Sequence, residues 1–140
     1  MTAARAKPYR LTQPVVPEHS LQKQIADVLR LELAPPGKVS RLGVCWWAVD
    51  HAAYSGEVPG IRIGRGVVAG LPDLFFLHRG MSFMVELKTV LGELSDAQRS
   101  VCAAMLGSGG RVGVARTVEE VLACLDGWGL PRAHRVQVAA

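Results

Sequence analysis

Two acidic residues and one lysine carry the clearest chemical pattern in this sequence. Glu86 and Lys88 are two positions apart near the end of an apolar run, so in a β-strand their side chains share a face. Asp73 precedes another apolar run. Two carboxylates, with the backbone carbonyl of Leu87 nearby, are hard oxygen ligands of the kind that Mg²⁺ and Mn²⁺ prefer. Beside such a metal, Lys88 would orient a water and offset negative charge on phosphorus, which is the chemistry of phosphodiester cleavage.

A hairpin should bring the two acids together. The β-like runs at 74–77 and 81–87 flank an Arg-Gly dipeptide, which is typical of a tight turn between antiparallel strands. A two-residue turn places Asp73 opposite Glu86, where like charges repel, so we expect a cationic group between them. A loop of odd length without a bulge would instead turn the two acids to opposite faces of the sheet.

Two further polar residues are candidates for the same site. Glu18 lies three residues before Leu21, on or beside the apolar stripe of the first predicted helix, where an acid is unusual. It either complements the dipole of that helix or has a role beside the metal. Gln98 completes a capping box that begins at Ser95, and it either serves only as that cap or also contacts the site.

The predicted elements describe one α/β domain with the order αβββαβα and no internal repeat. Apolar residues recur at helical spacing after Glu18 until Pro35-Pro36-Gly37 stops the pattern. Short apolar runs bounded by turn residues are typical of buried strands. The expected elements are helices at 18–33, 95–107 and 117–127, strands at 42–49, 74–77, 81–87 and 111–115, and a long glycine-rich loop at 51–70.

The composition limits the class of protein. With 140 residues, of which 49% are hydrophobic and 20% charged, the chain can bury a core and fold as one domain. Three widely spaced cysteines argue against a disulfide framework or a zinc site. No apolar stretch reaches 18 residues and no signal sequence is visible, so we expect a cytoplasmic protein that does not contact membranes.

Basic residues occur in two segments that we do not expect to pack into the hydrophobic core. The net charge is +4, and arginines outnumber lysines by 12 to 4, which favours a polyanionic partner. We expect residues 1–16 to form a flexible basic arm, 17–130 the domain, and 131–140 a C-terminal tail. The residues expected to contact phosphate are Arg5, Lys7 and Arg10 in the arm and Arg62 and Arg65 in the glycine-rich loop.

The glycine-rich loop also suggests a nucleotide site, which we reject. The stretch from Gly64 to Gly70 is similar to a dinucleotide-binding fingerprint, but that motif must follow a strand and open a helix. Pro72 and the strand expected from Leu74 leave no room for such a helix. We therefore expect no nucleotide cofactor.

These candidate residues together resemble a known nuclease family. Each short motif is weak alone, but the combination with the order of elements is more specific. The VRR-NUC branch of the PD-(D/E)XK nuclease superfamily is similar over most of residues 17–126, in the string Gly70-Leu71-Pro72-Asp73, in Glu86-Leu87-Lys88, in Gln98 on the next helix and in Glu18 on the first. The chain departs from the family at His51-Ala-Ala-Tyr54, where relatives commonly have His-x-x-Asn.

The resemblance implies a restriction-endonuclease-like core of αβββαβ order with a C-terminal helix, in which helices flank a central mixed sheet. It implies Mg²⁺ or Mn²⁺ bound by Asp73 and Glu86, Lys88 as the catalytic lysine, and supporting roles for Gln98 and for Glu18 beside the metal. It further implies a homodimeric endonuclease acting on branched DNA such as four-way junctions. The alternatives are a non-catalytic DNA-binding or assembly module on the same fold and, less favoured, a metabolic α/β enzyme.

Overall fold

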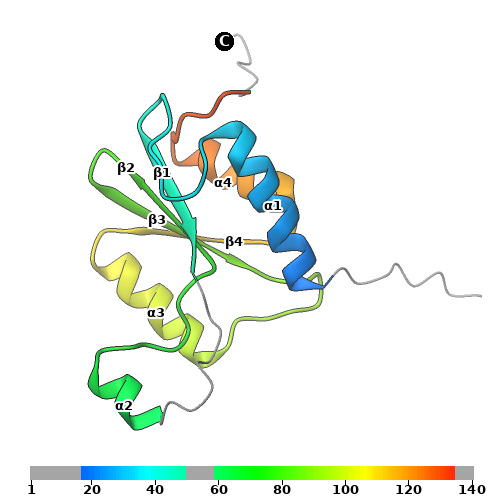
Figure 1. Ribbon diagram of the computed structural model, residues 1–140. Coiled ribbons are helices and arrows are strands. Elements are labelled where there is room, and N and C mark those ends of the chain that lie inside the picture. The colour runs from blue at the N-terminus through cyan, green and yellow to red at the C-terminus, as the bar shows by residue number, and fades with distance from the viewer. Residues whose placement is uncertain (1–16, 50–58, 135–140) are drawn as a thin grey trace, which may run out of the picture.

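The structure, a computed structural model, describes residues 17–49 and 59–134 (Figure 1). This part of the chain has a mixed α/β fold, as the sequence predicts, and it contains no helix long and apolar enough to cross a membrane. The helices are α1 (Glu18–Glu32), α2 (Pro59–Gly64), α3 (Asp96–Gly107) and α4 (Val118–Gly127). The strands are β1 (Val44–Ala48), β2 (Leu74–His78), β3 (Met81–Leu87) and β4 (Arg111–Ala115).

The strands form one mixed sheet in the order β1-β2-β3-β4. β2 is antiparallel to both of its neighbours, β1 and β3, and β4 is parallel to β3. The turn between β2 and β3 has Arg79 at φ 49° and Gly80 at φ 75°, the two positive values that a type I′ hairpin requires. The register pairs His78 with Met81, so the predicted two-residue turn is confirmed.

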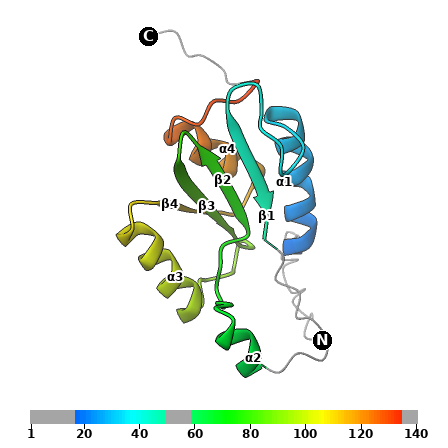
Figure 2. The same ribbon diagram turned by 60° about the vertical axis from the view of Figure 1, so that its left-hand side comes forward.

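Helices cover both faces of this sheet (Figures 1 and 2). One face packs with α1 and α4 around the main core, and Val85 and Leu87 of β3 belong to that core, as the predicted alternation requires. Glu86 points to the other face, where it contacts Gln98 of α3. The acid of β3 is therefore separated from the main core and placed under the start of α3.

The first helix is held against the sheet by its apolar stripe. Leu21, Ile25 and Leu29 are its buried residues, at the spacing that predicted the helix. Just beyond the helix, the Ala34 carbonyl accepts a hydrogen bond from the indole of Trp46 at 2.7 Å, which ties this segment to β1. The position of Glu18 in the first turn of α1 is thereby fixed relative to the sheet.

The segment expected to be a loop at 51–70 contains a short helix, α2, so the order of elements is αβαββαβα and not αβββαβα. Proline is well suited to the first helical position because its fixed φ is already helical and its missing N–H needs no partner there, and Pro59 begins α2. The many glycines in this segment favoured a loop in the sequence analysis, so the helix that begins at Pro59 was not predicted. The first strand is also shorter than the predicted 42–49, because Gly43 has a left-handed φ of 86°.

Candidate active site

Hydrogen bonds to both its side chain and its backbone hold Asp73 directly before β2. Its carboxylate Oδ2 accepts from the Leu87 backbone N–H at 2.7 Å, and its carbonyl oxygen accepts from the Val49 N–H at 2.8 Å. The first bond holds the Asp73 side chain against the strand that carries Glu86. The charge of Asp73 raises the pKa of Glu86, so the two acids interact across the hairpin as its register predicts.

Glu86 is the buried acid of the site, with 2% of its surface exposed. Its Oε1 accepts a hydrogen bond from Gln98 Nε2 at 2.6 Å. Its Oε2 is buried and has no hydrogen-bond partner among the described residues. Burial and then the charge of Asp73 raise the pKa of Glu86 from 4.5 to about 7, against the opposing effect of Lys88. A buried ionised carboxylate oxygen without a partner is costly, and either a proton or a cationic ligand would reduce that cost.

Lys88 places a cation beside Glu86, while a cationic group between the two acids stays a prediction. Its Nζ lies 3.5 Å from Glu86 Oε1, and its side chain is 11% exposed. Its backbone N–H donates to the Ala115 carbonyl at 3.0 Å, so the pairing of β3 with β4 continues through this residue. The sheet therefore fixes the backbone of Lys88. Its ammonium group lies beside Glu86, which with Asp73 forms what we call the acid cluster.

Gln98 has both of the roles that the sequence left open. Its Oε1 accepts from the Ser95 N–H at 2.9 Å, and its own backbone N–H donates to Ser95 Oγ at 3.2 Å, which completes the predicted capping box. The remaining group of the amide, Nε2, donates to Glu86. One side chain therefore caps α3 and orients the buried acid.

The glycine at position 70 is required by the packing of the loop that leads to Asp73. Gly70 has φ +88°, and a Cβ there would lie 2.5 Å from the carbonyl carbon of Ala97 and 2.7 Å from the backbone nitrogen of Gln98. Pro72, two residues later, is fully buried. The loop therefore packs against the first turn of α3, which fixes Asp73 relative to Gln98.

Gly70→Ala is expected to destabilise the fold by about 2 kcal/mol or more, because alanine adds left-handed strain and an overlap with the backbone of α3. Equilibrium unfolding in urea measures the loss. Gly64→Ala is the matched control, since a Cβ at that position meets nothing within 4 Å. Equal stability of Gly70→Ala and the unaltered protein would show that the loop does not pack on α3 in this way.

Glu18 acts on the site through its charge. It is an exposed residue in the first turn of α1, a position that complements the helix dipole. Its charge also raises the pKa of Glu86, as the smallest of the effects on that group. The first-turn position agrees with the helix-dipole role, and a role of Glu18 beside the metal stays a prediction.

The donor set fits a Mg²⁺ or Mn²⁺ ion whose coordination is completed by water and substrate. In residues 17–49 and 59–134, no three or more His, Cys, Asp or Glu side chains gather as a metal-binding group. Magnesium sites often use only one or two protein carboxylates together with waters and substrate phosphates. Asp73 and Glu86 meet that number, and the unpartnered Oε2 of Glu86 offers a ligand atom. The Leu87 carbonyl remains the predicted backbone ligand.

Arg116 lies near the site and was not singled out by the sequence. Its guanidinium Nη1 donates to the carbonyl oxygens of Thr89 and Gly92, the second at 2.7 Å. Because β3 and β4 are parallel, the residues that follow them leave the sheet at the same edge. Lys88 directly follows β3 and Arg116 directly follows β4. A prediction that these two strands are parallel would therefore have placed Arg116 near Lys88.

The predicted phosphate-binding residues are only partly described. Arg62 lies in α2 and is half-buried, and Arg65 follows the helix and is exposed. The Arg65 N–H donates to the Ile61 carbonyl at 3.1 Å, so Arg62 and Arg65 belong to the same short helical segment. Their contacts with DNA remain a prediction. The predicted site residues Arg5, Lys7 and Arg10 lie outside the described ranges, and so does His51, where the chain departs from the family pattern.

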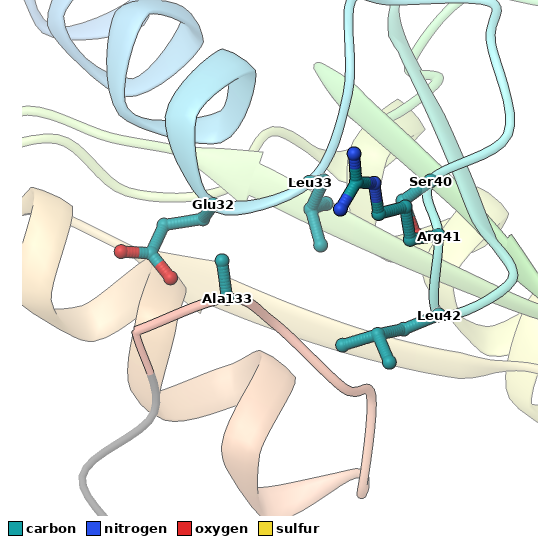
Figure 3. Close-up of a pocket in the computed structure, with 6 residues that line it drawn as sticks. All are labelled: Glu32, Leu33, Ser40, Arg41, Leu42 and Ala133. Carbon is teal, nitrogen blue, oxygen red and sulfur yellow. The ribbon is translucent and has the colours of Figure 1, made fainter.

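A pocket beside the other end of α1 is separate from the acid cluster (Figure 3). Its volume is about 160 Å³, whereas pockets for drug-sized ligands usually have about 300–1,000 Å³. Nearby, Arg132 binds Glu32 at 3.0 Å and Asp126 at 2.9 Å, which attaches residues 131–134 of the predicted tail to the domain. The lining residues are Glu32, Leu33, Ser40, Arg41, Leu42 and Ala133.

Comparisons of this chain with family models, with curated proteins and with solved structures found no match. The interpretation of the site therefore rests on its own geometry. That geometry consists of a buried acid with an oxygen that has no partner in the described part of the chain, a second acid that interacts with it, and a lysine 3.5 Å from the buried acid.

Proposed function

We propose that this protein is a Mg²⁺- or Mn²⁺-dependent DNA endonuclease with a PD-(D/E)XK core. The observation that carries the proposal is the buried carboxylate of Glu86, whose Oε2 has no hydrogen-bond partner among the described residues. The charge of Asp73 acts on this carboxylate, and the Lys88 ammonium lies 3.5 Å from its other oxygen, Oε1. A divalent cation would offset the repulsion between the acids and the cost of burying an ionised Glu86. The mixed sheet, with an antiparallel hairpin followed by a helix and a parallel strand, supports this core, in which α2 is an insertion.

Each side chain of the site has a role that follows from its place. Asp73 and Glu86 would hold the metal, with the Leu87 carbonyl as a further ligand. When bound, the metal supplies a polarised phosphate and a more acidic water. Lys88 would direct its ammonium protons at the phosphate oxygens and stabilise their added charge in the transition state. Gln98 keeps Glu86 oriented through the 2.6 Å bond.

The proposed substrate is branched DNA such as a four-way junction, cut by a homodimer that presents two sites to two strands. The net charge of +4 supports a polyanionic partner. A non-catalytic module on the same fold would bind a labelled junction in Mg²⁺ without hydrolysing it. Denaturing electrophoresis of end-labelled strands separates the two, because only an endonuclease produces shortened strands.

Asp73→Asn is expected to weaken Mn²⁺ binding by about 10- to 100-fold and to leave the metal-free protein as stable as before or more so. Asparagine keeps an oxygen for the Leu87 N–H and removes the charge that opposes ionisation of Glu86. Calorimetric titration and urea unfolding in EDTA measure the two effects. Asp73→Ala is the control, because it also loses the 2.7 Å bond and should cost about 1–3 kcal/mol. A large loss of metal-free stability in Asp73→Asn would make Asp73 a structural residue.

Arg62→Ala/Arg65→Ala is expected to weaken binding of branched DNA without changing which DNA is preferred. Each lost phosphate contact should reduce the slope of log affinity against log salt by about 0.9. Fluorescence anisotropy over a salt series in Ca²⁺ measures this slope, with Arg30→Ala, an exposed arginine paired with Asp27 on α1, as the control. An unchanged slope would refute the proposed phosphate contacts of Arg62 and Arg65. Normal affinity combined with slow cleavage would instead indicate that this segment controls access to the active site.

A further inference from the structure

An apolar turn projects from the protein beside Lys88. In this turn the Gly92 N–H donates to the Thr89 carbonyl at 3.0 Å. The two central residues, Val90 and Leu91, are 72% and 80% exposed. The central positions of tight turns usually hold Gly, Pro, Asn, Asp or Ser, so turn geometry does not account for a valine and a leucine there.

Hydrogen bonds from Arg116 hold the base of the turn. Arg116 Nη1 donates to the carbonyl oxygens of both Thr89 and Gly92, which closes the two ends of the turn. A Cβ on Gly92 would lie 3.4 Å from Lys88 Cδ, so the base of the turn packs against the Lys88 side chain. Leu91 is three residues from Lys88, which limits the separation of their Cα atoms to about 10 Å. The apolar tip therefore lies close to the backbone of Lys88.

We propose that Val90 and Leu91 form an apolar wedge that contacts unstacked DNA bases next to the scissile phosphate. This inference rests on the proposed endonuclease function, because that function places the phosphate at Lys88. Apolar side chains inserted at base steps stabilise unstacked or kinked DNA, and the unstacking cost is lowest where the duplex is already interrupted. The wedge therefore favours DNA with a branch point or unpaired bases over a continuous duplex.

A second protein chain is a poorer occupant for this tip. Stable protein–protein interfaces use about 20–30 residues on each side, whereas the exposed tip has two. The neighbouring groups, Lys88 and the acid cluster that it faces, are the proposed phosphate and metal site. The chemistry beside the tip thus points to a nucleic acid, and a protein partner becomes an outcome of the test.

The test uses Val90→Ser/Leu91→Ser, which removes apolar surface at two exposed positions. The control, Leu31→Ser/Val39→Ser, changes the same residue types at 73% and 71% exposure elsewhere in the protein. Each protein is titrated in Ca²⁺ with a four-way junction that carries 2-aminopurine at the branch point, and with a continuous duplex that carries the same base. 2-Aminopurine becomes more fluorescent when it is unstacked. Circular dichroism and sedimentation report folding and oligomeric state.

We expect the unaltered and control proteins to increase the fluorescence of the junction. Val90→Ser/Leu91→Ser should lose most of that increase and bind the junction about tenfold more weakly, with duplex binding unchanged. If the wedge variant equals the unaltered protein on the junction, the inference is wrong and the endonuclease proposal stands. A fluorescence increase that requires Val90 and Leu91 in a protein that cuts no DNA in Mg²⁺ would support the wedge and overturn the endonuclease. Altered sedimentation with unaltered fluorescence would assign the tip to a second chain and overturn the wedge.

Discussion

Glu86→Gln is expected to abolish DNA cleavage and, in the same protein, to stabilise the metal-free fold. Glutamine keeps an oxygen for the hydrogen bond from Gln98 but carries no charge, so it removes a metal ligand and also the cost of ionising a buried acid. The pKa of Glu86, raised from 4.5 to about 7, corresponds to a gain in unfolding free energy on the order of 3 kcal/mol above neutral pH.

The gain should depend on pH in a defined direction. Between pH 4.5 and about 7, folded Glu86 holds a proton that the unfolded chain has lost, so the free energy of unfolding of the unaltered protein falls as the pH rises. Below pH 4.5 this group is protonated in both states and makes no difference. Urea unfolding in EDTA over this range compares the two proteins. Unfolding free energies that run parallel across the window would contradict the burial of an ionisable Glu86.

Divalent metal provides a second readout for the same substitution. A ligand that binds only the folded state raises the melting temperature, so Mg²⁺ or Mn²⁺ should stabilise the unaltered protein above pH 7. Glu86→Gln should lose most of this response because it replaces Oε2, the proposed ligand atom, which has no hydrogen-bond partner within residues 17–49 and 59–134. An equal metal response in both proteins would place the metal at another site.

Lys88→Ala is expected to slow cleavage by about 100- to 1,000-fold while folding and metal binding survive. The ammonium group is proposed to stabilise charge in the transition state and is not a metal ligand. Its charge also lowers the pKa of Glu86, so without it Glu86 ionises at higher pH. Metal affinity of the variant should therefore be measured over a pH series that extends well above 7, so that weaker binding caused by protonation of Glu86 is separated from loss of a ligand.

The matched control for this substitution is Lys38→Ala, which removes an exposed lysine between α1 and β1. It should cleave DNA at the unaltered rate. Single-turnover cleavage and calorimetric titration with Mn²⁺ give the two quantities to compare. If Lys88→Ala loses metal affinity and cleavage to the same extent at high pH, Lys88 serves to assemble the metal site and has no separate part in the reaction.

The arrangement of the acids could be predicted because it depends on local geometry. A two-residue turn between two β-like runs allows one register, and that register sets the position of Asp73 relative to Glu86. The alternation of side chains along β3 then places Val85 and Leu87 in the core and Glu86 on the opposite face. These inferences used only neighbouring residues and the period of a strand.

Other features depend on contacts between distant parts of the chain, which local patterns do not specify. Sequence spacing identified Gln98 as a cap, but its second bond, to Glu86, requires the packing of α3 on the sheet. The contact of Arg116 with Thr89 likewise depends on the crossover between two parallel strands. The missed helix α2 has a different cause, since glycines outweighed the proline that begins it.

The measurement that bears most directly on the proposed function is hydrolysis of an end-labelled four-way junction by the purified protein in Mg²⁺, in Mn²⁺ and in EDTA. We expect shortened strands from the unaltered protein with either metal, none in EDTA, and none from Glu86→Gln at the same concentration. Cleavage by Glu86→Gln at the unaltered rate would place the activity elsewhere. If the unaltered protein binds the junction in Mg²⁺ and in Mn²⁺ but leaves its strands intact, that result would contradict the assignment of an endonuclease.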